Sequence, residues 1–426
     1  MVSIPRGFRD FPPPFMILRK RVLSKIEEVF KRYGFDPFET PVLEYWETVK
    51  GKLGEEAETR LMFIFPDFLS KEWYTLRYEL TFPLARYMAM HPETPLPFKR
   101  YHIGRVWRHE EPQRGRYREF WQCDADIVGS PYPEADAEVV KLNMEVMRAF
   151  DFEDFTVKVN DRRLLTGIFE EELGITNPIP VYRSIDKLDK VGERGVRSDL
   201  LSKGMHELLV DKIMDLISRR GKFDEIAESM RGMANEKAQE ALKHLEELFS
   251  IVEDDRLVFD LSLVRGLEYY TGPVFETTVR EPKIGSLAGG GRYDKLIGLY
   301  SGKDVPATGV SVGVERLIDA GLELGIFDLG EKSYIQVFVV SVRRESWRYA
   351  WRVAEVLRGA GFYVSLDLMR RSQSSQREYA RKLGTKVIAF VGPKEEESGT
   401  VTLYTEEVRR TVNLREVTRA VSDLLP

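Results

Sequence analysis

The segment Lys99–Gly129, KRYHIGRVWRHEEPQRGRYREFWQCDADIVG, constrains the fold most strongly, because it predicts a long β-hairpin. Two β-prone runs flank a charged loop that contains Pro112 and Gly115. Successive side chains of a strand face opposite sides of the sheet. One face of the second run carries Trp121, Cys123, Ala125 and Ile127, and the other carries Phe120, Gln122, Asp124 and Asp126. The first face belongs to a core, and the second combines an aromatic ring, an amide and two carboxylates.

This polar face has two interpretations. A solvated face would give the same alternation, because antiparallel sheets often expose one side to water. The connecting loop, however, concentrates charge: Glu110, Glu111, Arg114, Arg116, Arg118 and Glu119. Guanidinium groups at this density suit a polyanionic ligand. We therefore interpret the polar face as a binding site, and we expect Arg108 of the first run to reach it.

The length and composition are those of an ordinary globular chain. Its 426 residues allow two or three domains, and 43% hydrophobic with 31% charged residues is a typical balance. No apolar run approaches the roughly 20 residues of a membrane helix, and MVSIPRGFRDFPPP has no secretory h-region. We therefore expect no membrane association and a cytoplasmic protein. The single cysteine excludes an internal disulfide framework and a Cys-based zinc site, and we predict no metal site.

Charge is unevenly distributed along the chain. The net charge is −5, but residues 333–426 hold 16 Lys and Arg against 11 Asp and Glu. An acidic body with a basic C-terminal part suggests local attraction of a polyanion. Ordinary scatter of surface charge explains the same imbalance.

Periodicity divides the chain into two predicted domains, residues 1–325 and 333–426. The first begins with an amphipathic helix over Phe15–Tyr33 and contains a highly charged helical segment at about 165–253. Residues 321–332 predict a linker. From Tyr334 onward, strands and helices alternate, which predicts βα units with right-handed crossovers.

Three successive glycines, Gly289–Gly291, invite comparison with phosphate-binding loops. Neither of the usual glycine-rich phosphate motifs matches SLAGGGRYDK. Glycines also permit close backbone approach between strands or to a ligand, and both explanations stay open here.

Several motifs resemble class II aminoacyl-tRNA synthetases, in the histidyl-tRNA synthetase form. The run from Arg108, R-H-E-x-P-Q-x-G-R-Y-R-E-F-x-Q, closely resembles the second class II motif. RGLEYYT at 265–271 and the GGGRYD segment resemble the two histidine-specific motifs, and PATGVSVGVERLIDAG at 306–321 resembles the third class II motif. LRYELT at 76–81 matches the family's L-R-x-D/E-L-T. Asp126 stands where bacterial members usually have Glu, so the chain looks archaeal or eukaryotic.

The resemblance implies an α+β class II catalytic domain, with an antiparallel sheet flanked by helices and a helical insertion, followed by a C-terminal α/β anticodon-binding domain. It implies ligation of L-histidine to tRNA(His) through a histidyl-adenylate, using ATP with Mg²⁺, by a homodimer without a tightly bound cofactor. Such a reaction needs positioning and charge stabilisation around a phosphate rather than an enzyme nucleophile.

The resemblance also implies site residues. Arg108 and Arg265 would act on the α-phosphate and the substrate carboxylate. The expected histidine-binding residues are Glu79, Leu80, Thr81, Arg108, Gln122, Asp126, Arg265, Tyr269, Tyr270 and Tyr293. The expected ATP-binding residues are Arg108, Glu110, Arg116, Phe120 and Arg316.

Three alternatives remain at this point. A non-charging relative, the regulatory subunit of ATP phosphoribosyltransferase, resembles this catalytic domain but should lack the C-terminal domain. Another class II synthetase, for threonine or proline, is disfavoured by RGLEYYT. A simple RNA-binding module would not require the polar row beside Arg108.

Overall fold

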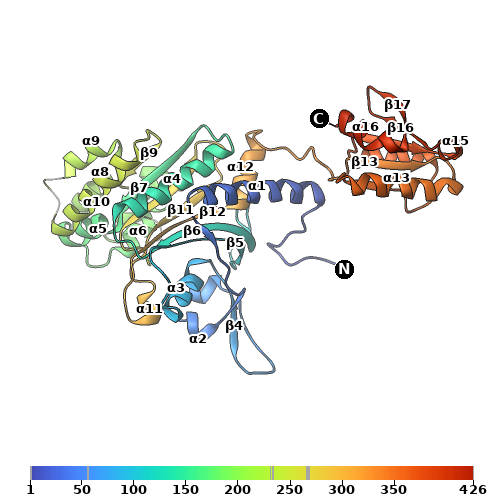
Figure 1. Cartoon of the computed structure of the whole chain (residues 1–426). Helices are drawn as coiled ribbons and strands as arrows, with labels where there is room; N and C mark the ends of the chain where they lie inside the picture. Colours follow the sequence, from blue (N-terminus) through green and yellow to red (C-terminus); the bar gives the residue numbers. More distant parts are fainter. Residues whose placement is uncertain (1, 55–56, 231, 233–234, 265–268, 426) are drawn as a thin grey trace. The chain divides into compact units, whose positions relative to one another are not determined.

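The computed structural model describes residues 2–54, 57–230, 232, 235–264 and 269–425 (Figure 1). The chain forms two compact units. The first contains residues 1–9 and 22–327, and the second contains residues 10–21 and 328–426. None of the helices formed by these described residues combines the length and apolar character needed to span a bilayer.

A nine-stranded sheet, ordered β1-β5-β6-β12-β11-β10-β7-β9-β8, organises the first unit. Its strands are β1 (Asp36–Pro37), β5 (Phe98–Trp107), β6 (Glu119–Val128), β7 (Phe155–Asp161), β8 (Arg220–Gly221), β9 (Leu257–Asp260), β10 (Pro273–Val279), β11 (Ala288–Arg292) and β12 (Ala307–Gly313). The run from β5 to β7 is antiparallel, as predicted, but β1 pairs parallel with β5 and β7 with β9. The sheet is therefore mixed. Helices intervene between both pairs along the chain, and such crossovers permit parallel pairing.

The predicted hairpin is confirmed as β5 and β6. In its register Arg100 lies opposite Asp126, and His102 lies opposite Asp124. Cys123, Ala125 and Ile127 are buried at 3% exposure or less, on the apolar side of β6. Asp124 and Asp126 thus occupy the other side, together with the residues opposite them on β5.

Helices cover the sheet, and a small second sheet adjoins it. The helices are α1 (Pro13–Arg32), of which residues 22–32 belong to this unit, α2 (Trp46–Val49), α3 (Thr81–Met90), α4 (Pro133–Ala149), α11 (Gly298–Ser301) and α12 (Val314–Glu323), with one π-turn, η1 (Ala57–Leu61). The predicted stripe of α1 is buried from Leu18 to Phe30. Helix α4 contacts β12 and α12 contacts β6, and Figure 1 shows both along the sheet. The small sheet, in the order β2-β4-β3, consists of β2 (Leu43–Tyr45), β4 (Trp73–Leu76) and β3 (Ile64–Pro66).

The charged segment after β7 forms the predicted helical insertion. It consists of α5 (Arg162–Leu165), η2 (Thr166–Glu172), α6 (Ile179–Ile185), α7 (Leu188–Ser202), α8 (Glu207–Ser218), α9 (Phe223–Met230) and α10 (Glu236–Val252). Helix α10 packs against α4 and α5, and Figure 1 shows these helices gathered beside β7 and β9. The insertion is thereby joined to the sheet through α4.

The second unit is the predicted α/β domain. Its sheet, in the order β14-β13-β15-β16-β17, contains β13 (Val337–Ser341), β14 (Val364–Leu366), β15 (Val387–Val391), β16 (Thr400–Tyr404) and β17 (Arg409–Asn413). Its helices are η3 (Arg344–Ser346), α13 (Trp347–Gly359), α14 (Gln373–Lys382), α15 (Pro393–Ser398), η4 (Leu414–Glu416) and α16 (Val417–Leu424). Apolar residues of α13 and α16 share one core cluster, and Ala380 of α14 belongs to another.

The predicted linker begins earlier than the structure allows. Helix α12 continues to Glu323, so residues 321–323 are helical. Gly321 permits this continuation beside Phe327, because a Cβ at Gly321 would lie 2.2 Å from the Phe327 ring.

Candidate functional site

A cavity of about 280 Å³ opens over the polar side of β6. Twelve of the fourteen residues predicted for the site line it: Glu79, Thr81, Arg108, Glu110, Arg116, Phe120, Gln122, Asp126, Tyr269, Tyr270, Tyr293 and Arg316. They come from α3 and the segment before it, from β6 and α12, from the hairpin loop, and from the segments before β10 and after β11, so the fold gathers motifs that are far apart in sequence. Arg265 lies outside the described residues.

Leu80 is the exception among the described predicted residues. Its side chain is fully buried and does not line the cavity. Its backbone carbonyl instead accepts a hydrogen bond from Arg100 Nη2 at 3.0 Å. Leu80 precedes α3, where its apolar side chain turns into the core, and it therefore supports Arg100 rather than forming the cavity wall.

Glu79 serves both the cavity and the start of α3. Its Oε1 accepts the backbone N–H of Phe82 at 2.5 Å, which satisfies a free donor of the first helical turn. Burial raises the pKa of Glu79, and hydrogen bonds from the Phe82 N–H and the Thr81 side chain partly offset this rise. The side chain of Glu79 therefore caps the first turn of α3 and also lines the cavity.

Arg108 and Arg116, the arginines of the second motif in the cavity lining, lie in the part of the cavity that contains Phe120. Arg108 Nε donates to the carbonyl of Tyr78 at 3.2 Å, and its guanidinium lies 5.2 Å from the Phe120 ring centre. Arg116 Nη1 lies 3.7 Å from Glu110 Oε2. A flat aromatic ring beside guanidinium groups offers a stacking surface together with anion contacts.

Arg316 is held by backbone groups in the first turn of α12. Its Nε donates to the Gly115 carbonyl at 2.7 Å, and its Nη1 donates to the Ser286 carbonyl at 3.0 Å. Its neighbour Glu315 accepts the Trp121 N–H at 2.8 Å. These contacts fix α12 against the hairpin, and they bring the second and third motifs to one wall.

Asp126 lies at the opposite, fully buried end of the cavity. Its Oδ2 is 2.8 Å from Arg100 Nη2, and its Oδ1 accepts the Tyr293 hydroxyl. Burial raises the pKa of Asp126, and Arg100 and the Tyr293 hydrogen bond oppose the rise. Tyr269 packs near this end, with its ring centre 4.6 Å from Tyr270 and 6.2 Å from Tyr293. A carboxylate within an aromatic wall can orient a small heteroaromatic ligand through its ring N–H.

The glycine run is a strand rather than a phosphate loop. Gly289, Gly290 and Gly291 belong to β11, between β10 and β12. A Cβ at Gly290 would lie 2.1 Å from the Gly309 carbonyl oxygen. Of the two explanations that the sequence left open, close backbone approach is therefore the one that the structure supports.

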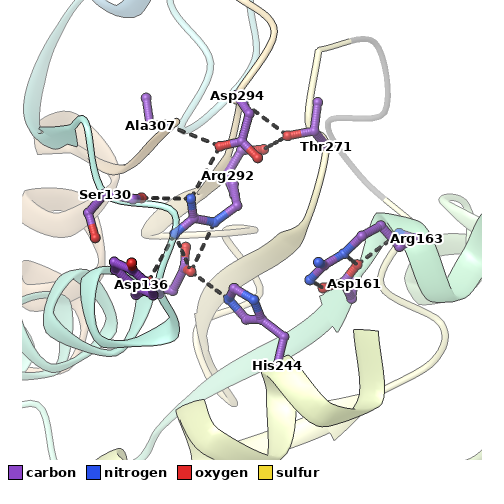
Figure 2. A network of polar contacts seen from close by, with 10 residues as sticks. Ser130, Asp136, Asp161, Arg163, His244, Thr271, Arg292, Asp294 and Ala307 are labelled. Carbon is purple, nitrogen blue, oxygen red and sulfur yellow. Dashed lines mark hydrogen bonds and ion pairs between the residues drawn. The ribbon is translucent and has the colours of Figure 1, made fainter. Parts of the chain in front are cut away.

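Arg292, at the end of β11, is the centre of a buried polar network (Figure 2). Its guanidinium contacts Asp136 Oδ2 of α4 at 2.6 Å through Nη2 and at 3.0 Å through Nε. Its Nη1 reaches the Ser130 carbonyl at 2.9 Å and Asp294 Oδ1 at 3.2 Å. His244 of α10 lies 2.8 Å from the same Asp136 oxygen, so the network joins the insertion to β11.

The same network holds the segment that contains the two tyrosines. Thr271 N–H donates to the Arg292 carbonyl at 2.8 Å, and the Asp294 N–H donates to the Thr271 hydroxyl at 3.0 Å. Tyr293 lies directly between Arg292 and Asp294 in sequence. Its hydroxyl, which contacts Asp126, is therefore positioned by polar contacts outside the cavity.

Family comparisons agree with this geometry. The model described as "Histidyl-tRNA synthetase" matches residues 7–317, and the model described as "Anticodon binding domain" matches residues 336–424. The first match spans well over half of the chain.

The chain belongs to the histidyl-tRNA synthetase family.

Similar proteins extend this family assignment over the whole chain. "Histidine--tRNA ligase" of Korarchaeum cryptofilum is 76% identical over 425 residues, covering 100% of this chain and 99% of the relative. "Histidine--tRNA ligase" of Aeropyrum pernix is 58% identical, covering 99% and 98%. The histidyl-tRNA synthetase family resemblance read from the motifs is confirmed, including its archaeal character.

Solved structures share the fold. The crystal structure of histidyl-tRNA synthetase from Nostoc sp. PCC 7120 matches with a TM-score of 0.83 and 28% identity, covering 99% of both chains. A Bacillus halodurans structure described as "ATP phosphoribosyltransferase regulatory subunit/histidyl-tRNA synthetase" matches with a TM-score of 0.76 and 24% identity, covering 92% of this chain and 98% of that one. The latter likeness concerns the fold alone.

The sequence did not point to three residues in and around the cavity: Asp124 and Ser311 line it, and Arg100 pairs with Asp126. Arg100, Asp124 and Ser311 were not assigned, although Asp124 stood in the predicted polar row. The pairing of Arg100 with Asp126 depends on the β5–β6 register, which the hairpin pattern alone does not specify to one residue. Ser311 comes from a strand nearly 190 residues away, opposite Asp124 in the β12–β6 register.

Proposed function

We propose that the cavity activates L-histidine with ATP, and that the histidyl-adenylate formed there is transferred to tRNA. As a member of its family, the chain is a histidine--tRNA ligase that consumes ATP. The observation that carries the site proposal is the position of Asp126. It lies between Arg100 and the Tyr293 hydroxyl at the buried end of a cavity whose other walls hold Arg108, Arg116 and Arg316.

The two ends of the cavity suit the two substrates. Asp126, Tyr269 and Tyr270 would receive the imidazole, and Glu79, Thr81 and Gln122 would receive the α-ammonium. Phe120 would stack on adenine, while Glu110 and Arg116 hold the nucleotide and Arg316 holds the γ-phosphate. Mg²⁺ would enter as part of the ATP substrate.

Arg108 would stabilise charge where the two substrates meet. The substrate carboxylate attacks the α-phosphorus, and negative charge develops on the phosphate oxygens and on the departing pyrophosphate. A guanidinium fixed before the reaction stabilises this charge without reorganisation. The Tyr78 carbonyl and the faces of Tyr78 and Phe120 restrict the motion of Arg108. Arg265, by its resemblance to the family motif, is proposed to stabilise the same developing negative charge.

Residues 1–325 would form the catalytic domain and 333–426 the anticodon-binding domain, acting on tRNA(His) as a cytoplasmic homodimer. Size-exclusion chromatography with light scattering tests the dimer, and a mass of one chain would contradict it.

Amino-acid-dependent ATP–pyrophosphate exchange, measured with all twenty amino acids, tests the function of the cavity. We expect exchange with histidine alone. In Asp126→Asn the histidine KM should rise at least tenfold, because one buried acceptor of a ligand N–H is lost, while the ATP KM changes little. Exchange with a different amino acid, or an unchanged histidine KM in Asp126→Asn, would contradict the assignment.

A further inference from the structure

Asp124 is a second carboxylate in the histidine end of the cavity, and its surroundings differ from those of Asp126. It is 3% exposed and lines the cavity between Gln122 and Asp126 on the polar side of β6. Arg100 makes its ion pair with Asp126, and within the described part of the chain Asp124 makes none. Its Oδ1 has no hydrogen-bond partner among those residues.

The cations near Asp124 act on it at a distance, and neither forms an ion pair with it. On β5 it faces His102, and Arg100 and Arg77 interact with it electrostatically. Burial lowers the pKa of His102 to about 3, with Arg100 and Arg77 adding to the effect, so this imidazole is neutral at physiological pH. From the other sides Asp126, Glu79 and Tyr270 face it, and none of them is a cation.

A buried carboxylate in this position is costly unless a positive charge balances it. Burial, followed by repulsion from Asp126 and Glu79, raises the pKa of Asp124 to about 8, although Arg100 and the Ser311 hydrogen bond oppose the rise. We therefore expect the free protein to hold a neutral carboxyl at Asp124, beside Gln122, whose amide donates to the Ser311 hydroxyl at 2.7 Å. An amino acid at neutral pH brings an ammonium group into the same space.

We propose that Asp124 is a proton-linked specificity residue: it is protonated in the empty site, and it ionises when the positive charge of the amino-acid substrate enters. The proton leaves to solvent, and the resulting carboxylate balances the ligand cation. Asp124 thereby makes a contact that a neutral or anionic molecule of the same shape does not obtain. This inference rests on the proposed role of the cavity in binding histidine.

Isothermal titration calorimetry of the full chain with L-histidine alone, without ATP, tests this inference. Titrations at pH 7 in phosphate and in Tris, whose ionisation enthalpies differ, report the protons released on binding. For a carboxyl with a pKa of about 8, we expect wild type to release close to one proton per site more than Asp124→Asn. The difference between the two proteins removes the contribution of the ligand's own imidazole.

The pH dependence of affinity provides the second measurement. From pH 6.5 to 8, histidine affinity should rise more steeply in wild type than in Asp124→Asn, by up to about tenfold per pH unit. Asp154→Asn, a change at a side chain 68% exposed, is the matched control and should behave as wild type. Equal proton release and equal slopes in wild type and Asp124→Asn would overturn the proposal.

The outcomes separate this inference from the function of the cavity. If Asp126→Asn raises the histidine KM but Asp124→Asn leaves proton release unchanged, the proposal for Asp124 fails and the site assignment holds. If neither wild-type calorimetry nor Asp126→Asn kinetics shows histidine binding at the cavity, the site assignment fails as well. Thermal unfolding of Asp124→Asn checks that the isosteric amide preserves the fold.

Discussion

The buried pair of Asp136 and Arg292 offers the sharpest test of how the proposed histidine pocket is held in place. The two side chains are 0% and 2% exposed, and two guanidinium nitrogens contact one carboxylate oxygen. Removing one partner of such a pair leaves a buried charge, which costs about 3–5 kcal/mol. In Asp136→Asn, Arg292 keeps its contacts with Asp294 and the Ser130 carbonyl. We therefore expect the free energy of unfolding to fall by an amount at the lower end of this range, about 3 kcal/mol.

The assay is urea unfolding of the full chain, followed through the transition of the first unit. A double-mutant cycle with Asp136→Leu, Arg292→Met and the double variant isolates the pair. We expect the double variant to lose about 2–3 kcal/mol less than the sum of the single variants, because no charge stays buried alone. Melting temperatures should fall by roughly 5–10 °C in each single variant.

Function provides a second readout. Arg292 adjoins Tyr293, and its carbonyl accepts a hydrogen bond from the Thr271 N–H, so loosening this network should disturb the proposed histidine end of the cavity more than the proposed ATP end. We expect a histidine KM that rises severalfold more than the ATP KM in pyrophosphate exchange with Asp136→Asn. Additive losses in the cycle, single costs below about 1 kcal/mol, or equal changes in both KM values would refute the reasoning.

Three further predictions test other parts of the site. Gly309→Ala places a Cβ 2.0 Å from Asp126 Oδ1, so the carboxylate must move. Exchange kinetics should show a higher histidine KM with the ATP KM nearly unchanged. A histidine KM equal to that of wild type would refute the contact. Arg316→Ala should raise the ATP KM at least tenfold while calorimetric histidine affinity without ATP stays at the wild-type value; a normal ATP KM would remove Arg316 from the nucleotide site. The pKa of His102 is lowered from 6.5 to about 3, so the unfolded chain binds its proton first, and the stabilisation present above pH 6.5 is lost as the pH falls. The raised pKa of Asp124 has the opposite effect on stability, so the test compares variants. Between pH 7 and 4.5, the change in the urea-measured free energy of unfolding should be about 2.5 kcal/mol more favourable in His102→Gln than in wild type, and the surface variant His91→Gln should match wild type.

Local sequence patterns were sufficient to predict the hairpin, α1 and the C-terminal βα units, because the spacing of apolar residues follows the repeat of each type of secondary structure. Alternation in the second strand of the hairpin separates Cys123 and Ala125 from Asp124 and Asp126, and the structure places them on the two predicted sides. The stripe of α1 and the βα alternation after Tyr334 report burial in the same way. Strand direction at the sheet margins was not predictable from such periods, because the same alternation fits parallel and antiparallel partners.

For the cavity, too, the sequence motifs identified the residues but not their pairing. The motifs identified Glu79, Arg108, Gln122, Asp126 and others as members of one cavity, because a motif preserves residue types at fixed spacing. They gave no information on which carboxylate is paired. That distinction comes from Arg100, which reaches Asp126 rather than Asp124 through the register of two strands.

The amino-acid order therefore specifies the elements, the family and most of the residues that meet in the cavity. Tertiary structure decides the electrostatic surroundings of these residues: Asp126 pairs with Arg100, Asp124 makes no ion pair within the described part of the chain, burial lowers the pKa of His102, and Tyr293 is held through Arg292 from outside. The physical reason is that periodicity and motif spacing are local properties of the chain. A pKa or a buried ion pair depends on distances and burial between segments up to nearly 190 residues apart, as between Asp124 and Ser311, and these distances exist only in the folded protein.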